Sequence, residues 1–333
     1  MRNQTQVPEF VLWGLTRIPE LQQLLFWVLF LAYMLTLMGN ILIIIITCTD
    51  YHLHSPMYFF LRNLSFSEIC LTTVVVPRLL TDLRTERRTI SFAACLSQYF
   101  FHFLFGGTEI FLLTAMSFDR YVAICCPLLY TSIMSQRLCF LLVIFSWMGG
   151  LLLILTPVFL TSQLSFCKSN VINHFFCDYT SLMQISCGDK NLLELIHFLL
   201  AFFILFSTLL LILVSYAYIL ITIMQIPSAK GRQRAFSTCS SHLIVISICF
   251  GSCILMYVRP IQDEDLDLNK GLAIINTVLV PLLNPFIYTL RNQQVKEALR
   301  DILEWLIILT IKKDPENSES VPYPFHYLLT KNK

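Results

Sequence analysis

The sequence predicts an all-α membrane protein, a bundle of seven transmembrane helices followed by a short amphipathic helix on the membrane surface. Hydrophobic residues make up 56% and charged residues only 13% of the 333 residues, whereas soluble domains carry about 25% charged residues. Mean hydropathy is +0.69. Seven apolar runs approach the roughly 20 residues that a helix needs to cross a bilayer. Runs of this length are helices rather than barrel strands, because a backbone in lipid must satisfy its own hydrogen bonds.

The predicted spans follow one another along the chain at 24–48, 57–80, 93–118, 138–160, 192–223, 237–258 and 271–290. They divide the chain into an N-terminal segment, 1–23, a seven-helix domain, 24–290, an interfacial helix, 291–311, and a polar cytoplasmic tail, 312–333, which we expect to be disordered. No charged segment with an A-x-A site precedes the first run, so no cleaved signal peptide is expected. The net charge of +2 gives no indication of nucleic-acid binding.

The orientation is predicted from three features. With the N-terminus outside, slightly more than half of the basic residues face the cytoplasm, which agrees weakly with the positive-inside rule. Asn3 begins a glycosylation sequon that is useful only if this end is lumenal. Four cysteines lie at the same membrane face, Cys95, Cys167, Cys177 and Cys187, and in an oxidising compartment they allow three pairings. We therefore expect a multi-pass plasma-membrane protein with an extracellular N-terminus.

Polar residues inside the spans mark the interior of the bundle. His102 and Glu109 lie seven residues apart on one face of the third span, and Glu68 lies midway along the second. Two carboxylates in a membrane without a basic partner must be protonated, share a proton or hold a cation. We expect a sodium or proton site formed by Glu68 and Glu109. The alternative is that both are neutral acids hydrogen-bonded to Asn40 and Asn284.

Six ordered motifs carry a resemblance to a known family. They are LHSPMYFFL (53–61), MSFDRYVAIC (116–125), NVINHFFCD (170–178), SY (215–216), RAFSTCSSH (234–242) and PLLNPFIYTLRN (281–292). In order and spacing they resemble the motifs of olfactory receptors, a family of rhodopsin-like (class A) G-protein-coupled receptors. The resemblance runs from about residue 9 to 303, and the loop cysteines together with MYVRP (256–260) resemble the class II branch.

The resemblance implies an odorant receptor, which binds small, mostly apolar molecules in an outer transmembrane pocket. It also implies activation of a stimulatory heterotrimeric G protein that raises cyclic AMP. The partners are then an odorant, the G protein and the lipid bilayer, with no cofactor except a possible allosteric sodium ion. An enzyme is not indicated, since the chain has no HExxH, P-loop or G-x-S-x-G pattern.

Site residues follow from the same resemblance. The implied ligand-binding residues are His102, Phe103, Gly106, Gly107, Ala201, Ile204, Phe250, Cys253, Tyr257 and Thr277. None of them is an arginine or lysine, which argues against a carboxylate as the main agonist.

The implied residues of G-protein coupling and activation are Asp119, Arg120, Tyr121, Tyr216, Asn284, Pro285 and Tyr288. In this scheme Arg120 faces the cytoplasmic cleft and Asp119 restrains it at rest. Pro285 removes a backbone hydrogen bond and kinks the seventh span. The implied disulfides are Cys95–Cys177 and Cys167–Cys187.

The sequence disfavours three other kinds of membrane protein. An opsin would need a lysine where Val278 stands, and an amine receptor would place an acid at His102. A transporter would show internal repeats or broken helices in matching halves, and the sequence shows neither. Two alternatives stay open: a chemosensory class A receptor that acts in a non-olfactory tissue, and a poorly functional receptor, because Glu68, Cys126 and Phe250 depart from the family's pattern.

Overall fold

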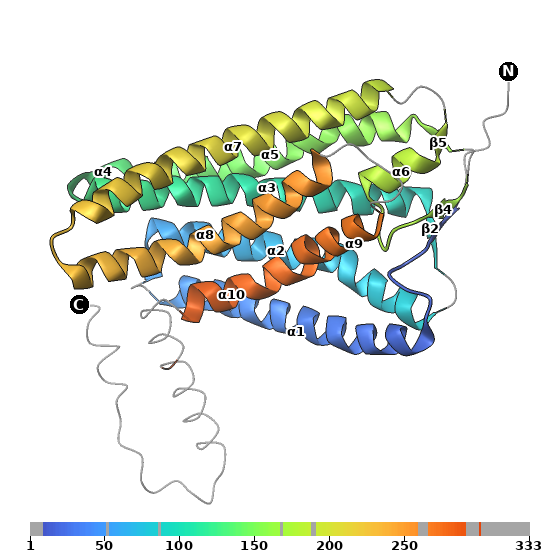
Figure 1. The fold of residues 1–333 in the computed structure, drawn as a ribbon, viewed down its shortest axis with the longest axis horizontal. Coiled ribbons are helices and arrows are strands. Elements are labelled where there is room, and N and C mark those ends of the chain that lie inside the picture. Colours follow the sequence, from blue (N-terminus) through green and yellow to red (C-terminus); the bar gives the residue numbers. More distant parts are fainter. Residues whose placement is uncertain are drawn as a thin grey trace, which may run out of the picture.

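The fold is a bundle of seven membrane-spanning helices (Figure 1), seen in a computed structural model that describes residues 9–50, 53–85, 88–166, 169–187, 191–258, 266–290 and 300. The helices are α1 (Pro19–Thr49), α2 (Pro56–Arg84), α3 (Phe92–Cys125), α5 (Gln136–Ser162), α7 (Asn191–Gln225), α8 (Ala229–Tyr257) and a composite seventh span. All seven are long and apolar enough to cross a membrane. The predicted spans are confirmed, and the helices extend beyond most of their predicted ends.

Short strands close one end of the bundle, which we call the sheet end. Strand β1 (Glu9–Leu12) pairs antiparallel with β2 (Thr89–Ser91) and parallel with β4 (Val171–Ile172). Strands β3 (Ser165–Phe166) and β5 (Ser186–Cys187) form a second, antiparallel pair. The short helix α6 (Tyr179–Ile185) lies in the same region (Figure 1). The opposite end, which we call the Arg120 end, carries the turn η2 (Pro127–Leu129) and helix α4 (Tyr130–Ile133).

The sheet end is tied to the bundle by a disulfide and by one glutamine. Cys95 at the start of α3 forms a disulfide with Cys177, as the resemblance implied. Beside it, the backbone N–H of Cys177 donates to Gln98 Oε1 at 3.0 Å, and Gln98 Nε2 donates to the carbonyl of Val74 at 3.1 Å. Cys187 is disulfide-bonded as well, and Cys167, its expected partner, lies outside the described residues. The loop is therefore held against α2 and α3.

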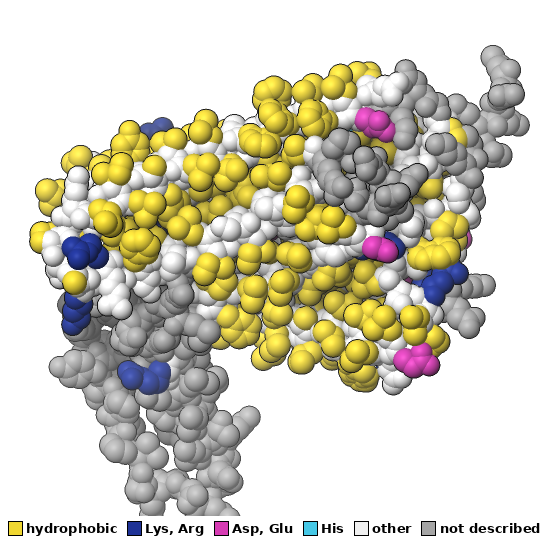
Figure 2. Space-filling model, viewed as in Figure 1, with side chains coloured by type: hydrophobic (Ala, Val, Ile, Leu, Met, Phe, Trp, Pro, Cys, Tyr) yellow, Lys and Arg dark blue, Asp and Glu magenta, His cyan; other side chains and the backbone are white. Residues whose placement is uncertain are grey.

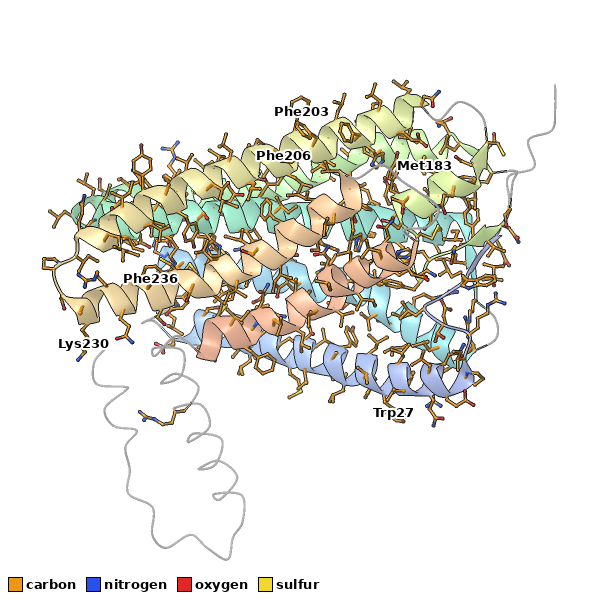
Figure 3. The ribbon with its side chains drawn as sticks, in the orientation of Figure 1. Trp27, Met183, Phe203, Phe206, Lys230 and Phe236 are labelled. Atoms are coloured by element: carbon orange, nitrogen blue, oxygen red, sulfur yellow. A yellow bond between two sulfur atoms is a disulfide. The ribbon has the colours of Figure 1, made fainter. Side chains whose placement is uncertain are left out.

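The outer faces of the helices are apolar, as a lipid environment requires. Figure 2 shows hydrophobic side chains over the flank of the bundle and charged side chains near its two ends. Trp27, Phe203 and Phe206 point away from the helices in Figure 3, and all three are exposed. By contrast, α3 runs through the middle of the bundle and buries most of the polar side chains that it carries. The core is thus built around α3.

Small residues allow two close helix crossings. A Cβ added at Gly39 of α1 would lie 2.8 Å from the Cβ of Pro285, and one added at Gly150 of α5 would lie 2.5 Å from Thr108 Oγ1. Both distances are shorter than side-chain contacts allow. Small residues at such crossings let membrane helices pack closely in the absence of a hydrophobic driving force.

The seventh span is not a uniform α-helix. It consists of α9 (Leu266–Ile274), a π-helical segment η4 (Ile275–Leu279) and α10 (Val280–Leu290), which continues through Pro285. A π segment is frequent at functional sites, and this one adjoins the cavity described below. Asn3, the predicted interfacial helix, 291–311, apart from Arg300, and the tail, 312–333, lie outside the described residues.

Candidate functional site

A cavity of about 550 Å³ opens among the helices in the sheet-end half of the bundle. Its lining comes from α2, α3, α5, α6, α7, α8 and the π segment. The lining residues are Leu71, His102, Phe103, Gly106, Gly107, Glu109, Ile110, Leu153, Ile154, Pro157, Tyr179, Thr180, Met183, Gln184, Glu194, His197, Phe198, Leu200, Ala201, Ile204, Leu205, Cys249, Cys253, Met256, Tyr257 and Asn276. The size and the mainly apolar lining suit a small molecule.

Eight of the ten residues implied as ligand-binding line this cavity. They are His102, Phe103, Gly106, Gly107, Ala201, Ile204, Cys253 and Tyr257. Phe250 does not: it packs in the core, one position beyond Cys249, which does face the cavity. Thr277 is fully buried outside the lining, and its neighbour Asn276 takes the place. In both cases one residue step, about 100° of helical rotation, separates the expected residue from the lining residue.

Four side chains that line the cavity carry a buried polar atom with no hydrogen-bond partner among the described residues. These atoms are His102 Nδ1, Glu109 Oε1, Tyr179 Oη and Gln184 Nε2. Buried polar groups are almost always paired, with protein, water or ligand. The cavity therefore offers hydrogen-bonding positions within an apolar surface, and no arginine or lysine stands among its lining residues.

The outer wall of the cavity is built on His197 of α7. The Tyr99 hydroxyl lies 2.8 Å from His197 Nε2, and the ring of Tyr179 stacks on the imidazole with centroids 3.5 Å apart. Tyr99 also meets Phe103 edge to face at 5.0 Å. Through these contacts α3, α6 and α7 form one rigid wall. Sequence reasoning missed His197 and Glu194, although two polar residues in an apolar span were a usable signal.

The wall formed by α8 and the seventh span is organised by Asn276, which lies in the π segment. Ser252 Oγ donates to Asn276 Oδ1 at 2.6 Å. The amide nitrogen of Asn276 lies 3.7 Å from Cys253 Sγ and 3.6 Å from Met256 Sδ. Asn276 therefore joins the seventh span to α8 at the surface of the cavity. No sequence motif pointed to it.

Below the cavity, Glu68 and Glu109 lie buried on neighbouring helices. Asn284 Nδ2 donates a hydrogen bond to Glu68 Oε1. The other expected partner, Asn40, donates to the carbonyls of Thr36 and Pro281, and it also lies close enough to act on the Glu68 carboxyl group. Only Glu109 also lines the cavity. No group of three or more His, Cys, Asp or Glu side chains suited to a metal occurs within the described ranges.

The Arg120 end holds most of the residues implied in activation, whereas Asn284 lies beside Glu68. Arg120 Nε is buried and has no hydrogen-bond partner within the part of the chain that the structure describes. The guanidinium lies near enough to Tyr216, His242 and Tyr288 for its charge to act on all three. The Tyr216 hydroxyl lies 2.7 Å from His242 Nδ1. This cluster brings α3, α7, α8 and α10 together.

Asp119 has a different partner from the expected one. Its Oδ1 accepts a hydrogen bond from the Tyr130 hydroxyl of α4 at 2.8 Å. Within the described residues no ion pair joins Asp119 to Arg120. The carboxylate is turned toward the loop between α3 and α5, so a restraint on Arg120 would act through space. The remaining residue of the motif, Tyr121, packs edge to face with Tyr218 of α7 at 5.9 Å.

Comparison with known proteins identifies the group to which this arrangement belongs. A sequence model described as "Olfactory receptor" matches residues 29–305. Human (Homo sapiens) olfactory receptor 2AP1 is 53% identical over 309 residues, which are 93% of this chain and all of that protein. Human olfactory receptor 6C4 is 54% identical over 309 residues with the same coverage. This chain belongs to the olfactory receptor family.

The solved structures agree about the fold. Squid rhodopsin matches with a TM-score of 0.69 at 18% identity, over 92% of this chain and 89% of that one. At this identity the match shows the fold alone. The olfactory receptor is thus a multi-pass membrane protein of the G-protein-coupled receptor fold, a signalling receptor for odorants and not an enzyme.

Two ionisable side chains in the loop at the sheet end have pKa values shifted by burial. Burial raises the pKa of Asp178, although Thr180 opposes the shift by donating from its backbone N–H at 3.1 Å and from its hydroxyl. Burial, helped by the nearby positive charge of Lys270, lowers the pKa of His174 to about 3. His174 is therefore a neutral packing residue at physiological pH, stacked on Phe175.

Proposed function

We propose that this receptor binds small, largely apolar odorants in the 550 Å³ cavity and activates a stimulatory heterotrimeric G protein, which raises cyclic AMP. The observation that carries the proposal is the cavity itself, apolar over most of its surface, with four unpaired polar atoms. An odorant with one hydroxyl, carbonyl or ester group fits this lining, because a few polar contacts fix the orientation of an apolar ligand. The carboxyl groups of Glu109 and Glu194 disfavour a carboxylate-bearing ligand.

Helix α8 is the proposed path from the cavity to the G protein. Cys249, Cys253 and Met256 face the cavity, and His242 on the same helix bonds Tyr216 at the Arg120 end. Cys253 and His242 are eleven residues apart, or about 16 Å along the helix. A ligand that binds better when α8 moves outward shifts the population toward that state. The movement would expose Arg120 to the G protein.

The orientation that we propose places the sheet end outside the cell and the Arg120 end in the cytoplasm, in the plasma membrane. The Cys95–Cys177 disulfide supports it, because disulfides persist in oxidising compartments. Glycosylation at Asn3 would accompany this orientation. A shift in electrophoretic mobility on deglycosylation, lost in Asn3→Gln, checks it.

We further propose a site for sodium or a proton at Glu68 and Glu109. Its support is the burial of two carboxyl groups without a basic partner among the described residues. The competing arrangement, two neutral acids, agrees with the hydrogen bond from Asn284 to Glu68. Agonist potency should change with sodium or pH in the wild type and become insensitive in Glu109→Gln. Equal indifference in both proteins would contradict the site.

The test of the main proposal is a cyclic-AMP assay over a broad odorant panel, in cells with verified receptor at the surface, with Arg120→Ala beside the wild type. A dose-dependent signal that the variant loses supports both ligand binding and coupling through Arg120. A signal that survives the substitution contradicts the role of Arg120. No cyclic-AMP signal despite good surface display would favour a poorly functional receptor. A response only to ligands found in non-olfactory tissues would favour a chemosensory receptor that acts in such a tissue.

A further inference from the structure

A second cavity, of about 670 Å³, lies near the Arg120 end, where α1 ends and where α2 and α5 begin. The signalling scheme above makes no use of it. Two arginines, Arg62 and Arg137, and one histidine, His54, contribute to its lining. None of its described lining residues is an aspartate or glutamate. The cavity therefore has a cationic wall without a compensating carboxylate.

The positive charge of this wall is available to a ligand. The Arg62 guanidinium contacts Cys48 Sγ at 3.2 Å and lies 5.2 Å from the centroid of the Phe59 ring. Arg137, the second residue of α5, is exposed. Across the described ranges, neither arginine forms an ion pair with a carboxylate. The nearest acid along the chain, Asp50, follows the end of α1 and does not line the cavity.

Two helix N-termini add to this charge. Pro56 begins α2 and Gln136 begins α5, and both line the cavity. The Ser55 side chain that precedes α2 makes no capping hydrogen bond, whereas the Ser135 hydroxyl that precedes α5 accepts from the Leu138 N–H at 3.4 Å. The first backbone N–H groups of a helix and its dipole favour an anion, a phosphate in particular. Arginine is suited to phosphate because its planar guanidinium donates two parallel hydrogen bonds.

The same cavity has an apolar border that faces the membrane. Phe140 lines it and is 59% exposed, and Ile144, one turn further along α5, is 42% exposed. Phe59 of α2 lines it as well. A free phosphate compound would leave this border unused. A molecule with an anionic head and acyl chains would use both parts.

We propose that this cavity binds the phosphate headgroup of an anionic phospholipid, of the polyphosphoinositide class, from the inner leaflet. The inference rests on the proposed orientation, in which the Arg120 end is cytoplasmic. The headgroup phosphates lie against Arg62, Arg137 and the start of α2 and α5, and the acyl chains lie along the outer face of α5. The receptor thereby carries a lipid site separate from its odorant cavity.

The test uses purified full-length receptor without odorant or G protein. A short-chain phosphatidylinositol bisphosphate is titrated against wild type, Arg62→Gln, Arg137→Gln and the charge-conserving Arg137→Lys, with phosphatidylcholine as the neutral lipid. Lys230→Gln is the matched control, because Lys230 is an exposed cation at the same end and does not line the cavity (Figure 3). Thermal unfolding of each variant verifies folding. Arg137 makes no described side-chain contact, so its substitution tests the site even if Arg62→Gln is unstable.

Each arginine substitution should weaken binding of the phosphoinositide about fivefold, the factor expected for one basic residue near an anionic surface. Lys230→Gln should bind like the wild type. Arg137→Lys keeps the charge but loses the paired hydrogen bonds, so its binding should lie between that of the wild type and that of Arg137→Gln. An equal loss in Lys230→Gln would overturn the proposal, because it would indicate diffuse attraction. So would equal binding of phosphatidylcholine, or equally tight binding of free inositol trisphosphate, which would make the ligand a soluble phosphate. None of these readouts depends on odorant signalling, so each proposal can fail alone.

Discussion

The Tyr216 hydroxyl and the His242 imidazole lie 2.7 Å apart and join α7 to α8 beside Arg120. Both side chains are buried, and the other ring nitrogen of His242, Nε2, has no hydrogen-bond partner among the described residues. A hydrogen bond between neutral groups contributes about 0.5–1.5 kcal/mol. The bond thus stabilises the arrangement of helices present in this structure by an amount that a ligand can offset.

Tyr216→Phe should raise basal cyclic AMP, because it removes this bond and keeps the ring. The expected change is about two- to tenfold in the equilibrium between closed and open states. Ser215→Ala is the control, since Ser215 is half-buried and its hydroxyl donates, among the described residues, only to the carbonyl of Leu211. Basal activity equal in both variants at equal surface level would show that the bond does not restrain α8.

Gly106→Leu should reduce the potency of bulky odorants at least tenfold while surface expression stays normal. A Cβ at Gly106 would meet no atom within 4 Å, so the new side chain enters the cavity without displacing a helix. Gly150→Leu is the matched variant, because its Cβ would collide with Thr108. Overpacking of this kind costs about 1–3 kcal/mol or more, and the receptor should be retained inside the cell. Dose–response curves and surface labelling check both, and equal behaviour of the two variants would contradict the cavity's position.

Asn276→Ala should raise the EC50 of odorants that carry a hydrogen-bonding group by about tenfold. The variant loses the hydrogen bond to Ser252 and a polar group at the cavity surface. A buried donor or acceptor that is left without its partner costs about 1–3 kcal/mol. Thr277→Val, the adjacent position outside the lining, should shift the EC50 less than twofold. The reverse order would mean that Thr277 and not Asn276 faces the ligand.

His174 should make the sheet end sensitive to acid. Its pKa is lowered to about 3 in the folded state, from an ordinary value of 6.5, so between these values the unfolded state binds more protons. The stabilisation is complete above pH 6.5 and is lost as the pH falls toward 3, with a slope of about 1.4 kcal/mol per pH unit. His174→Phe should remove the contribution of His174 to the slope, because phenylalanine does not titrate. The new ring should keep aromatic contacts with Phe175 and Phe176. Thermal unfolding of purified receptor between pH 7 and 4 measures it, and parallel curves for both proteins would contradict the assignment.

Much of this protein was predictable because the bilayer restricts the sequence so strongly. Apolar runs of about 20 residues can only be helices in lipid, and the seven spans followed from that. Buried polar residues such as His102 and Glu109 had to face the interior, and they do. The disulfide between Cys95 and Cys177 needed the family resemblance, since four cysteines permit three pairings.

The differences between the expected and the observed side-chain positions have a common physical origin in helical register and in loop packing. Phe250 and Thr277 were each one residue away from the position that faces the cavity. The π segment at Ile275–Leu279 alters the register of the seventh span, and no local pattern in the sequence indicates it. Tyr179 and Gln184 reach the cavity because α6 packs against α7, and Asp119 bonds Tyr130 because α4 follows directly.

By itself the sequence determined the membrane fold and the family, because hydropathy and ordered motifs depend only on residue types and their spacing. The tertiary structure decided which side chains share a surface: His197 with Tyr179, Asn276 with Ser252, and Arg62 with Arg137. Such pairs lie far apart in the chain, and they meet only when helix packing fixes the rotation and depth of every span.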